Sequence, residues 1–551
     1  MFLGRPLAAL LCSALAAASV LKHVADADVE FSYGSPAGQV PVDDMRHYKA
    51  HDWPHPHRPG KDTADKSIYQ VLSADDEGGG AAQQLVGWVS VQGFFAGLRS
   101  DRPGSVTLFA LPDSALQFPK HKKGGHRHRH GLLSALSAED PAALLDASQS
   151  LDLADVAAEL DAIESASDDD DDEKKERRRK IIKLIVRAIL EYHILPQATD
   201  LGALLANTTH ATNLTIPDGA LDEEALRIRV GATLVPPAVR VNFYSTVVQP
   251  NVVAKNGVIH VLDRPLLPPP SIFQTLFLVP KHFASLSSAL QRVKLANAVE
   301  WRYVHNEDSE DGKWQLEGAA SSTLFAPLNS AFAKLPWKLQ LFLFSPFGER
   351  VLGRLLQFHV VPGFVLHSDY LHNATAGEPP AWVVDADVQG LIDQEEEDFE
   401  EALFVDEFHC HHGKEYHKHG KDGNKGCKDR GRKGPRTPPH HGPHHEPEYA
   451  ANITLPTRLA NHTVDVHVLK YKTRVPLPGH KFDVYTTRVF VNRQRVVVAD
   501  VPARNGALHV VGSVLSPHPH HGKRVEGLQG GEVYDSWADW EEWLVDWAEA
   551  N

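Results

Sequence analysis

The sequence lacks the features that identify several common classes of protein. Acidic residues outnumber basic ones by 71 to 56, for a formal net charge of −15. This excludes a general nucleic-acid binder, whose surface needs positive charge to replace phosphate counterions. The chain has no G-x-S-x-G elbow, H-E-x-x-H helix, Walker loop or paired nucleophilic cysteine motif, so we predict neither an enzyme nor a cofactor. After residue 19 no hydrophobic run approaches the length of a membrane span, so we expect no integral membrane segment.

The first nineteen residues have the pattern of a secretory signal peptide. Arg5 supplies a positive charge, residues 7–15 form a short apolar stretch, and residues 16–19 are small, as a cleavage zone requires. The alternative is a buried N-terminal helix, but the segment has no amphipathic stripe and leads directly into polar sequence. We predict a signal peptide over 1–19 and a polar linker over 20–65.

Asn-X-Thr sequons fit the same compartment, because they indicate glycan-bearing surface only in a chain that enters the secretory pathway. They begin at Asn207, Asn213, Asn373, Asn452 and Asn461. The C-terminal residues 534–551 are rich in carboxylates and cannot form the hydrophobic tail of a GPI signal. We expect a glycoprotein that is secreted, extracellular or in the cell wall, with the vacuolar lumen as the alternative.

Four segments recur in the same order in the two halves of the chain. The matched pairs are 67–72 with 271–276, 107–116 with 323–332, 190–196 with 356–362, and 256–261 with 505–510. Four collinear matches indicate a duplicated structural unit.

The spacing between the matches shows where each copy has gained a loop. Residues 116 and 190 are 74 positions apart, whereas their equivalents in the second copy are 24 apart. The next interval is 60 positions in the first copy and 143 in the second. Loops tolerate such growth because closure entropy rises slowly with length. We predict domains over 66–269, with an insertion at about 117–180, and over 270–517, with an insertion at about 393–449, followed by an acidic, tryptophan-rich tail over 518–551.

Each repeated segment predicts a local structure. The Thr-Leu-Phe-Ala runs at 107 and 323 are short apolar strands followed by helix-start residues. Asn256-Gly257 is a turn dipeptide before the strand 258–262. Strands and helices alternate without a phosphate-binding βαβ unit, so we expect an α+β fold with a packed sheet in each copy.

These residues resemble the fasciclin domain. Its first box is similar to residues 323–336, its tyrosine-histidine motif to Tyr192-His193 and Phe358-His359, and its closing box to residues 256–268. The resemblance implies two tandem domains, each a wedge-shaped β-sheet core with several short helices, and it implies cell adhesion. The sequence departs from the family pattern after Leu116, at Phe358, and in both long insertions, which we expect to be disordered.

His193 and His359 are the residues that invite a catalytic interpretation. A histidine that follows an aromatic residue on an apolar segment is more often a core residue bonded to backbone, and nothing in the sequence completes a triad. We interpret Tyr192, His193, Phe358 and His359 as structural.

Cys410 and Cys427, both in the second insertion, are the cysteines that follow the predicted signal peptide. A disulfide is the default in an oxidising compartment. The alternative is a metal site, because His409, His411 and His412 surround the first thiol, although the spacing matches no standard zinc finger.

Further histidines gather in tracts, which can bind metal weakly or gain charge on acidification. They are His121, His126, His128, His130, His440, His441, His444, His445, His518, His520 and His521. A solvated, disordered loop is the simpler interpretation. The tracts nevertheless support an alternative function, a metal- or pH-responsive binding protein of the secretory or vacuolar lumen.

Four tryptophans near the C-terminus recur at helical spacing. They are Trp537, Trp540, Trp543 and Trp547, and the other helix face is acidic. Such a helix would either dock on the chain's own surface, which we favour, or contact a partner. The leading hypothesis for the whole chain is cell adhesion, with cell-surface or matrix proteins and glycans as partners.

Overall fold

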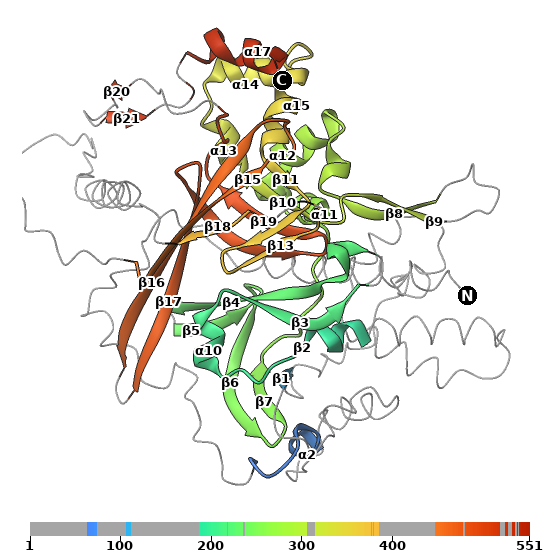
Figure 1. Cartoon of the computed structure of the whole chain (residues 1–551), viewed down its shortest axis with the longest axis vertical. Helices are drawn as coiled ribbons and strands as arrows, with labels where there is room; N and C mark the ends of the chain where they lie inside the picture. The colour runs from blue at the N-terminus through green and yellow to red at the C-terminus, as the bar shows by residue number, and fades with distance from the viewer. Residues whose placement is uncertain are drawn as a thin grey trace, which may run out of the picture.

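The computed structural model describes residues 63–73, 106–111, 187–216, 219–234, 237–305, 314–375, 377, 380–384, 447–477, 480–517, 524–526, 532–534, 537 and 539–550. Each repeat builds one large sheet, and the second repeat lies above the first in the view of Figure 1. The expected α+β fold with two sheet cores and short helices is confirmed.

The first sheet has seven strands in the order β2-β1-β7-β6-β5-β4-β3. The strands are β1 (Val106–Ala110), β2 (Ile194–Leu195), β3 (Thr209–Thr215), β4 (Ala225–Leu234), β5 (Pro237–Val241), β6 (Ser245–Ala254) and β7 (Gly257–Leu262).

The second sheet has eight strands in the order β11-β10-β19-β18-β17-β16-β15-β14, so it repeats the first sheet and adds β14. The strands are β10 (Ser322–Pro327), β11 (Val360–Pro362), β14 (Val383–Val384), β15 (Tyr449–Pro456), β16 (Thr463–Leu477), β17 (His480–Val491), β18 (Gln494–Ala503) and β19 (Gly506–Val511).

Three two-stranded ladders complete the strands. They are β8 (Trp301–His305) with β9 (Trp314–Gly318), β12 (Phe364–His367) with β13 (Tyr370–Asn373), and β20 (Arg524–Glu526) with β21 (Glu532–Tyr534). The helices are α2 (Ile68–Ser73), α10 (Leu201–Ala206), η2 (Ala220–Glu223), α11 (Ile272–Leu278), α12 (Pro280–Arg292), η3 (Ala296–Ala298), α13 (Asn329–Ala333), α14 (Trp337–Leu343), α15 (Glu349–Phe358) and α17 (Trp540–Ala550).

Each sheet contains one parallel pair, at the same place in both copies. β1 runs parallel to β7, with Val106 opposite Gly257, and β10 runs parallel to β19, with Ser322 opposite Gly506. A side chain at Gly506 would collide with the carbonyl oxygen of Ser322. The glycine of each Asn-Gly pair is therefore required by the close approach of two strands.

The first matched segment of each copy is a helix start. In the second copy Ser271 Oγ accepts from Gln274 N at 3.2 Å, while Ser271 N donates to Gln274 Oε1 at 3.4 Å. Ser67 and Gln70 form the same capping box before α2. The serine and glutamine of the repeated Ser-Ile-aromatic-Gln motif thus satisfy backbone groups at the start of the helix.

A buried asparagine attaches that helix to the sheet. Asn505 Oδ1 accepts from Ile272 N at 2.9 Å, and its Nδ2 donates to the carbonyl oxygens of Val299 (3.2 Å) and Ala319 (2.9 Å). Asn256 Oδ1 accepts from Ile68 N at 2.7 Å in the first copy. The closing box is therefore the point at which helix, loop and sheet meet.

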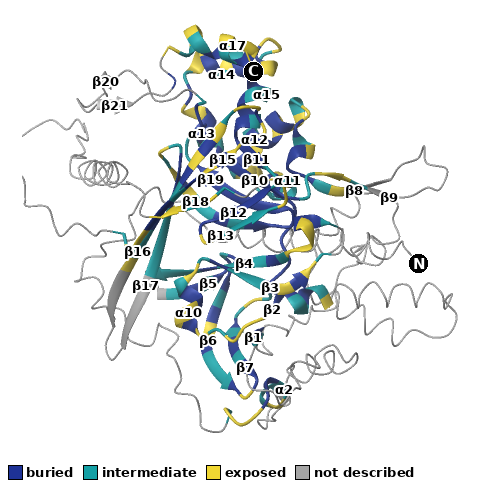
Figure 2. Cartoon of the chain, in the orientation of Figure 1, coloured by how far each residue is buried: buried dark blue, intermediate teal, exposed yellow. Residues whose placement is uncertain are grey.

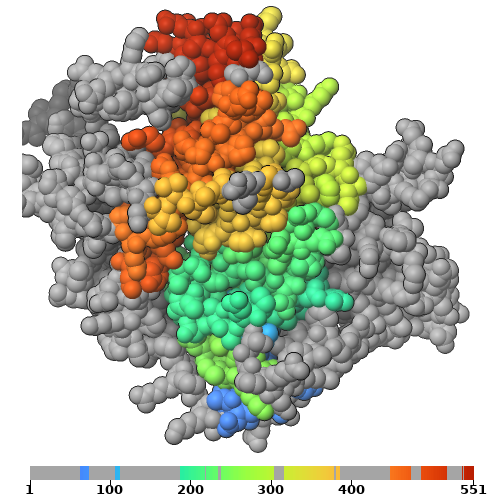
Figure 3. Space-filling view, viewed as in Figure 1, coloured from blue at the N-terminus to red at the C-terminus, as the bar shows by residue number. Residues whose placement is uncertain are grey.

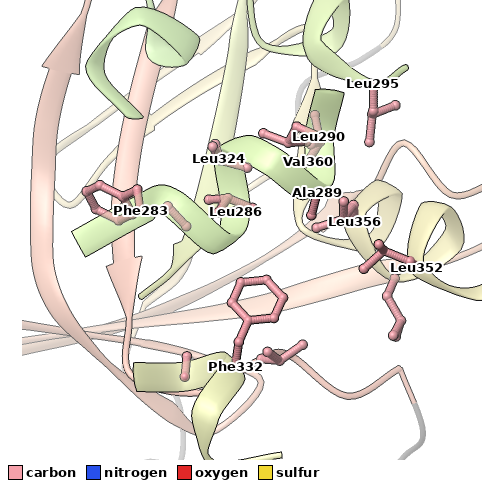
Figure 4. Close-up of a cluster of buried hydrophobic side chains, with 14 of the residues drawn as sticks. Phe283, Leu286, Ala289, Leu290, Leu295, Leu324, Phe332, Leu352, Leu356 and Val360 are labelled. Atoms are coloured by element: carbon pink, nitrogen blue, oxygen red, sulfur yellow. The ribbon is translucent and has the colours of Figure 1, made fainter. Parts of the chain in front are cut away.

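Apolar side chains fill both sides of the second sheet. Figure 4 shows one cluster, in which Leu286 and Leu290 of α12 lie near Leu324 of β10, and Ala289 of α12 lies near Leu356 of α15. Buried residues are concentrated in the two sheets and in the helix faces turned towards them (Figure 2). Val365 and Ala507 of the second domain pack within the apolar core of the first, so that core extends across the domain boundary.

The tryptophan-rich C-terminal helix packs on the second domain, as the favoured interpretation predicted. Trp537 is buried, and Trp540, Trp543 and Trp547 are half-buried against the same cluster as α12 and α15. Among the described residues no helix is both long enough and apolar enough to cross a membrane.

Candidate functional site: the interdomain junction

The two motif histidines lie in the cores and bond only to backbone in the contacts seen here. Nδ1 of His193 is 2.7 Å from the carbonyl oxygen of Ile189, and its Nε2 accepts from Leu266 N at 2.9 Å. His359 makes the equivalent bonds to Leu355 (2.7 Å) and Leu515 (2.9 Å). Each imidazole therefore connects a helix end to the segment that follows the closing box, and neither reaches a nucleophile.

Burial of these imidazoles disfavours their charged form. It lowers the pKa of His193 and of His359 from 6.5 to about 4, against the opposing effect of the backbone carbonyl that each ring contacts. Both rings are therefore neutral in the folded protein at neutral pH.

Acidification should destabilise the protein through these two residues. Between pH 6.5 and pH 4 the unfolded chain binds more protons than the folded one, so the free energy of unfolding falls as the pH falls. We expect a loss of about 2 kcal/mol for each histidine at pH 5. Urea unfolding of the parent and of His359→Gln at pH 7 and pH 5 measures this, and the variant should lose less between the two pH values. An equal loss in both proteins would contradict the assignment.

The aromatic residue before the motif histidine makes different contacts in the two copies, where the first has Tyr192 and the second has Phe358. In the first copy the Tyr192 hydroxyl donates to the carbonyl oxygen of Arg227 at 3.0 Å and accepts from Asn242 Nδ2 at 2.9 Å. Burial raises the pKa of Tyr192 above its usual range. In the second copy the Phe358 ring instead meets His462 edge-on, with ring centroids 6.1 Å apart.

Charged residues of the two domains meet at what we call the interdomain junction, formed by Thr209, Arg227 and Arg229 of the first domain and by Asp369 and Asp500 of the second. Asp369 accepts from Thr209 N at 2.8 Å and from Thr209 Oγ1 at 2.6 Å. Arg227 Nε donates to the same hydroxyl at 2.9 Å, and Arg229 Nε donates to the carbonyl oxygen of Ala499 at 3.0 Å. The contact between the domains is therefore hydrogen-bonded as well as apolar.

Asp500 is a completely buried carboxylate. Ser368 donates to it twice, from N at 2.6 Å and from Oγ at 2.5 Å, and Nδ1 of His367 lies 3.7 Å from Oδ1. Burial opposes ionisation, but the His367 and His509 imidazoles and the Ser368 donors outweigh it and hold the pKa of Asp500 below its usual range. Asp500 is therefore a buried anion.

The arginines of the first domain are the cations that face this anion. Burial lowers the pKa of Arg229, and the carboxylates of Asp500 and Asp369 oppose that shift. The Arg227 guanidinium lies 4.0 Å from the centre of the Tyr370 ring, an arrangement that also favours the charged form. Positive charge from one domain and negative charge from the other thus stabilise each other across the junction.

The first copy has a neutral residue where the second has Asp500. Asn251 N donates to His260 Nδ1 at 3.3 Å, and Asn251 Oδ1 accepts from Leu201 N at 2.8 Å. In the second copy Asp500 N donates to His509 Nδ1 at 3.4 Å, and Asp500 Oδ1 accepts from Ser368 N at 2.6 Å. Asn251 and Asp500 both have a left-handed backbone conformation. The two positions are structurally equivalent, and the carboxylate occurs in the copy that faces the arginines.

The β16–β17 hairpin forms a second contact between the domains. It extends from the second sheet to lie beside α10 of the first domain (Figure 1). The Lys470 ammonium bonds to the carbonyl oxygen of Ala206, at the C-terminal end of α10, where a cation is favourable. Thr208 Oγ1 lies 3.4 Å from Thr487 Oγ1.

A very small cavity lies at the junction. Its volume is about 10 Å³, enough for roughly one water molecule. Glu224, Arg227, His367 and Tyr370 contribute to its lining. Within the described part of the chain no group of three His, Cys, Asp or Glu side chains could hold a metal ion. The arrangement joins the two domains, and the cavity at this point is too small for a metabolite.

The structure places some of the predicted site residues and not others. Asn207, Asn213 and Asn461 are exposed, and Asn373 and Asn452 are half-buried. The following residues lie outside the described residues: Cys410, Cys427, His409, His411, His412 and the histidine tracts over 121–130, 440–445 and 518–521. Sequence reasoning did not identify the junction, although the Asn251-to-Asp500 difference between the repeats signals it.

Comparisons with known proteins agree with the duplicated architecture. The fasciclin domain matches residues 166–268 and 281–387. A fasciclin-like arabinogalactan protein of Arthroderma benhamiae is 35% identical over 133 residues, 24% of this chain and 26% of that protein. Aurofusarin biosynthesis cluster protein S of Gibberella zeae is 32% identical over 117 residues, 21% of this chain and 25% of that protein. The chain thus spans about a quarter of the length of these curated relatives.

One similar solved structure is the FAS1 domain pair of the insect cell adhesion molecule fasciclin I. It covers 79% of this chain and 97% of its own, with 13% sequence identity and a TM-score of 0.24.

Proposed function

The chain contains two fasciclin domains, and from this premise we propose that it is a secreted or lumenal glycoprotein acting in cell adhesion or in cell-surface and cell-wall interactions. The observation that carries the proposal is the interdomain junction, where Arg227, Arg229, Asp369 and Asp500 help to hold the two domains together around a very small cavity. Such a unit presents a broad outer surface to other macromolecules. Its function is binding and not catalysis.

Binding of the intact protein to its native cell surface tests the proposal. The full chain, secreted from a eukaryotic host so that it carries glycans, is incubated with intact cells and isolated cell walls of the source organism. We expect saturable retention of the folded protein and none of a heat-unfolded sample. Failure of the folded chain to bind either preparation would contradict an adhesion role.

Glycosylation supports this proposal and gives a separate prediction. Asn213 and Asn461 are exposed, Asn213 on the sheet-edge strand β3 and Asn461 in the turn between β15 and β16. Exposed asparagines are the ones that can carry glycans, and a glycan on an edge strand would also hinder strand pairing with other chains. The name of the Arthroderma relative likewise describes a glycan-bearing protein.

We expect both asparagines to carry glycans in the secreted protein. Enzymatic deglycosylation in H₂¹⁸O followed by peptide mass spectrometry should convert each to ¹⁸O-labelled aspartate. Thr215→Ala and Thr463→Ala should each abolish the label at one site and leave the other unchanged. Unlabelled Asn213 and Asn461 in the parent protein would show that the sequons are not used.

A further inference from the structure

An exposed apolar surface lies at the end of the second domain that is remote from the first. Among the described residues eleven large hydrophobic side chains are exposed, and four of them lie between positions 337 and 347. These four form what we call the aromatic ridge: Trp337 (68% exposed), Leu341 (65%), Phe344 (36%) and Phe347 (87%). Contiguous apolar surface of this kind is uncommon on a monomeric soluble protein and indicates an interface.

The first two residues of the ridge lie on helix α14, whose other faces pack against the rest of the domain. Trp337 and Leu341 are one turn apart on α14 and share a face, whereas Leu339 and Leu343 are buried beneath it. The C-terminal helix α17 covers a neighbouring side, because Phe342 stacks on Trp540 with ring centroids 5.7 Å apart. Figures 1 and 3 show α14 and the red C-terminal helix together at the end of the molecule opposite α2. Trp337 and Leu341 thus form the face of α14 that the described helices leave open, and Phe344 and Phe347 continue the ridge beyond the end of α14.

The two ends of the ridge differ in charge. At its N-terminal end Lys338 bonds to Glu541 at 3.2 Å, which places the exposed carboxylates of α17 beside Trp337. At its C-terminal end Arg292 Nη1 donates to the carbonyl oxygen of Phe344 at 2.7 Å, and Arg292 Nε lies 3.8 Å from the exposed carboxylate of Glu349. Arg350 is also exposed there, so these two arginines and one glutamate leave a net positive charge at this end. The ridge therefore runs from an acidic neighbourhood to a basic one.

This polarity decides between the possible occupants. An anionic lipid surface or a nucleic acid would be attracted at the basic end and repelled by the carboxylates of α17. A second copy of the chain, packed antiparallel across a two-fold axis, brings the acidic end of each ridge to the basic end of the other. We propose that the aromatic ridge is a self-association surface through which two copies of this chain form a symmetric dimer.

The size of the ridge sets the expected strength. At the observed exposures the four side chains offer roughly 400 Å² of apolar surface for each copy, about half of a standard interface. We therefore expect a weak dimer with a dissociation constant on the order of 10 μM.

Sedimentation velocity of the full glycosylated chain, at concentrations from about 1 to 100 μM around the expected constant, tests the proposal. The parent should shift from monomer to dimer, and Phe347→Glu should remain monomeric throughout. Val248→Glu, an equally drastic change at a 49% exposed valine of the first domain, should dimerise like the parent. The melting temperatures of both variants establish that they are folded, which is expected because both positions are exposed.

Salt dependence tests the antiparallel arrangement itself. Because the paired ends are charged, raising the sodium chloride concentration should weaken the dimer, whereas a purely apolar contact would not weaken. A parent that stays monomeric, a Phe347→Glu variant that dimerises normally, or a dimer that salt strengthens would overturn the proposal. Co-sedimentation of a monomeric parent with phosphatidylcholine–phosphatidylserine vesicles, lost in Phe347→Glu, would also overturn it in favour of a membrane.

Discussion

Replacing Asn505 with alanine should destabilise the second domain more than any other single change considered for that domain. The asparagine is completely buried and bonds three backbone groups, those of Ile272, Val299 and Ala319. Alanine would leave all three without their partner in the core, and each unsatisfied buried group costs about 1–3 kcal/mol. We expect the free energy of unfolding to fall by about 4 kcal/mol, allowing for partial relaxation.

Urea unfolding followed by tryptophan fluorescence measures this loss well, because eight of the ten tryptophans follow residue 300 and so report on the second domain. The matched control is Asn297→Ala. Asn297 is exposed and bonds only Glu317 in the contacts seen here, so its loss should cost less than about 0.5 kcal/mol. If the two variants unfolded at the same urea concentration, Asn505 would not be the anchor of α11.

Short-range structural requirements explain why the repeats could be recognised in the sequence. The strands predicted at Thr107, Thr323 and Val258 are confirmed, as β1, β10 and β7. Ser271 and Gln274 are three residues apart because a capping box requires that spacing, and Gly506 follows Asn505 because no side chain fits against Ser322. Such requirements act over a few residues, so the sequence displays them directly.

The interdomain junction depends on contacts that no local pattern reveals. Arg229 and Ala499 are 270 residues apart, and Thr209 and Asp369 are 160 apart. An arginine at an alternate position of a strand normally indicates a solvated face, so Arg229 reads as a surface residue until the second domain is placed against β4. The packing of one domain on another decides its role.

The exposure of the aromatic ridge also could not be predicted from the sequence. Trp337, Leu341 and Phe344 have the helical spacing of a core face, and the sequence alone would place them inside. The core is instead filled by the other face of α14 and by the tryptophans of α17, which the sequence places more than 190 residues later. Burial of a helix face therefore depends on which distant segment packs against it.

Replacing Asp500 with asparagine should weaken the attachment of the two domains while leaving the fold of each intact. Asn251 shows that an amide fits the equivalent backbone position and accepts the same backbone hydrogen bond. The change therefore removes the buried negative charge that faces Arg229 and keeps an acceptor for Ser368 N, although the oxygen that accepts from Ser368 Oγ is replaced by an amide nitrogen. Leaving the arginine with less compensation should lower the free energy of unfolding by about 2 kcal/mol. Calorimetry should then separate the unfolding of the first domain from that of the second.

A double-mutant cycle with Arg229→Gln distinguishes charge pairing from a merely local effect. If the two charges stabilise each other, Asp500→Asn should cost less in the Arg229→Gln background, with a coupling of about 1 kcal/mol. The loss should also be the same at pH 7 and pH 5. Asp500 has a depressed pKa in the folded protein, so its contribution is present above the ordinary aspartate pKa of 3.8 and declines only below it. A loss that differed between pH 7 and pH 5 would therefore assign the effect to another group and not to the carboxylate. If the loss in free energy of unfolding is the same at both pH values and Asp500 is coupled to Arg229, the Asp500 carboxylate stabilises the contact between the two domains.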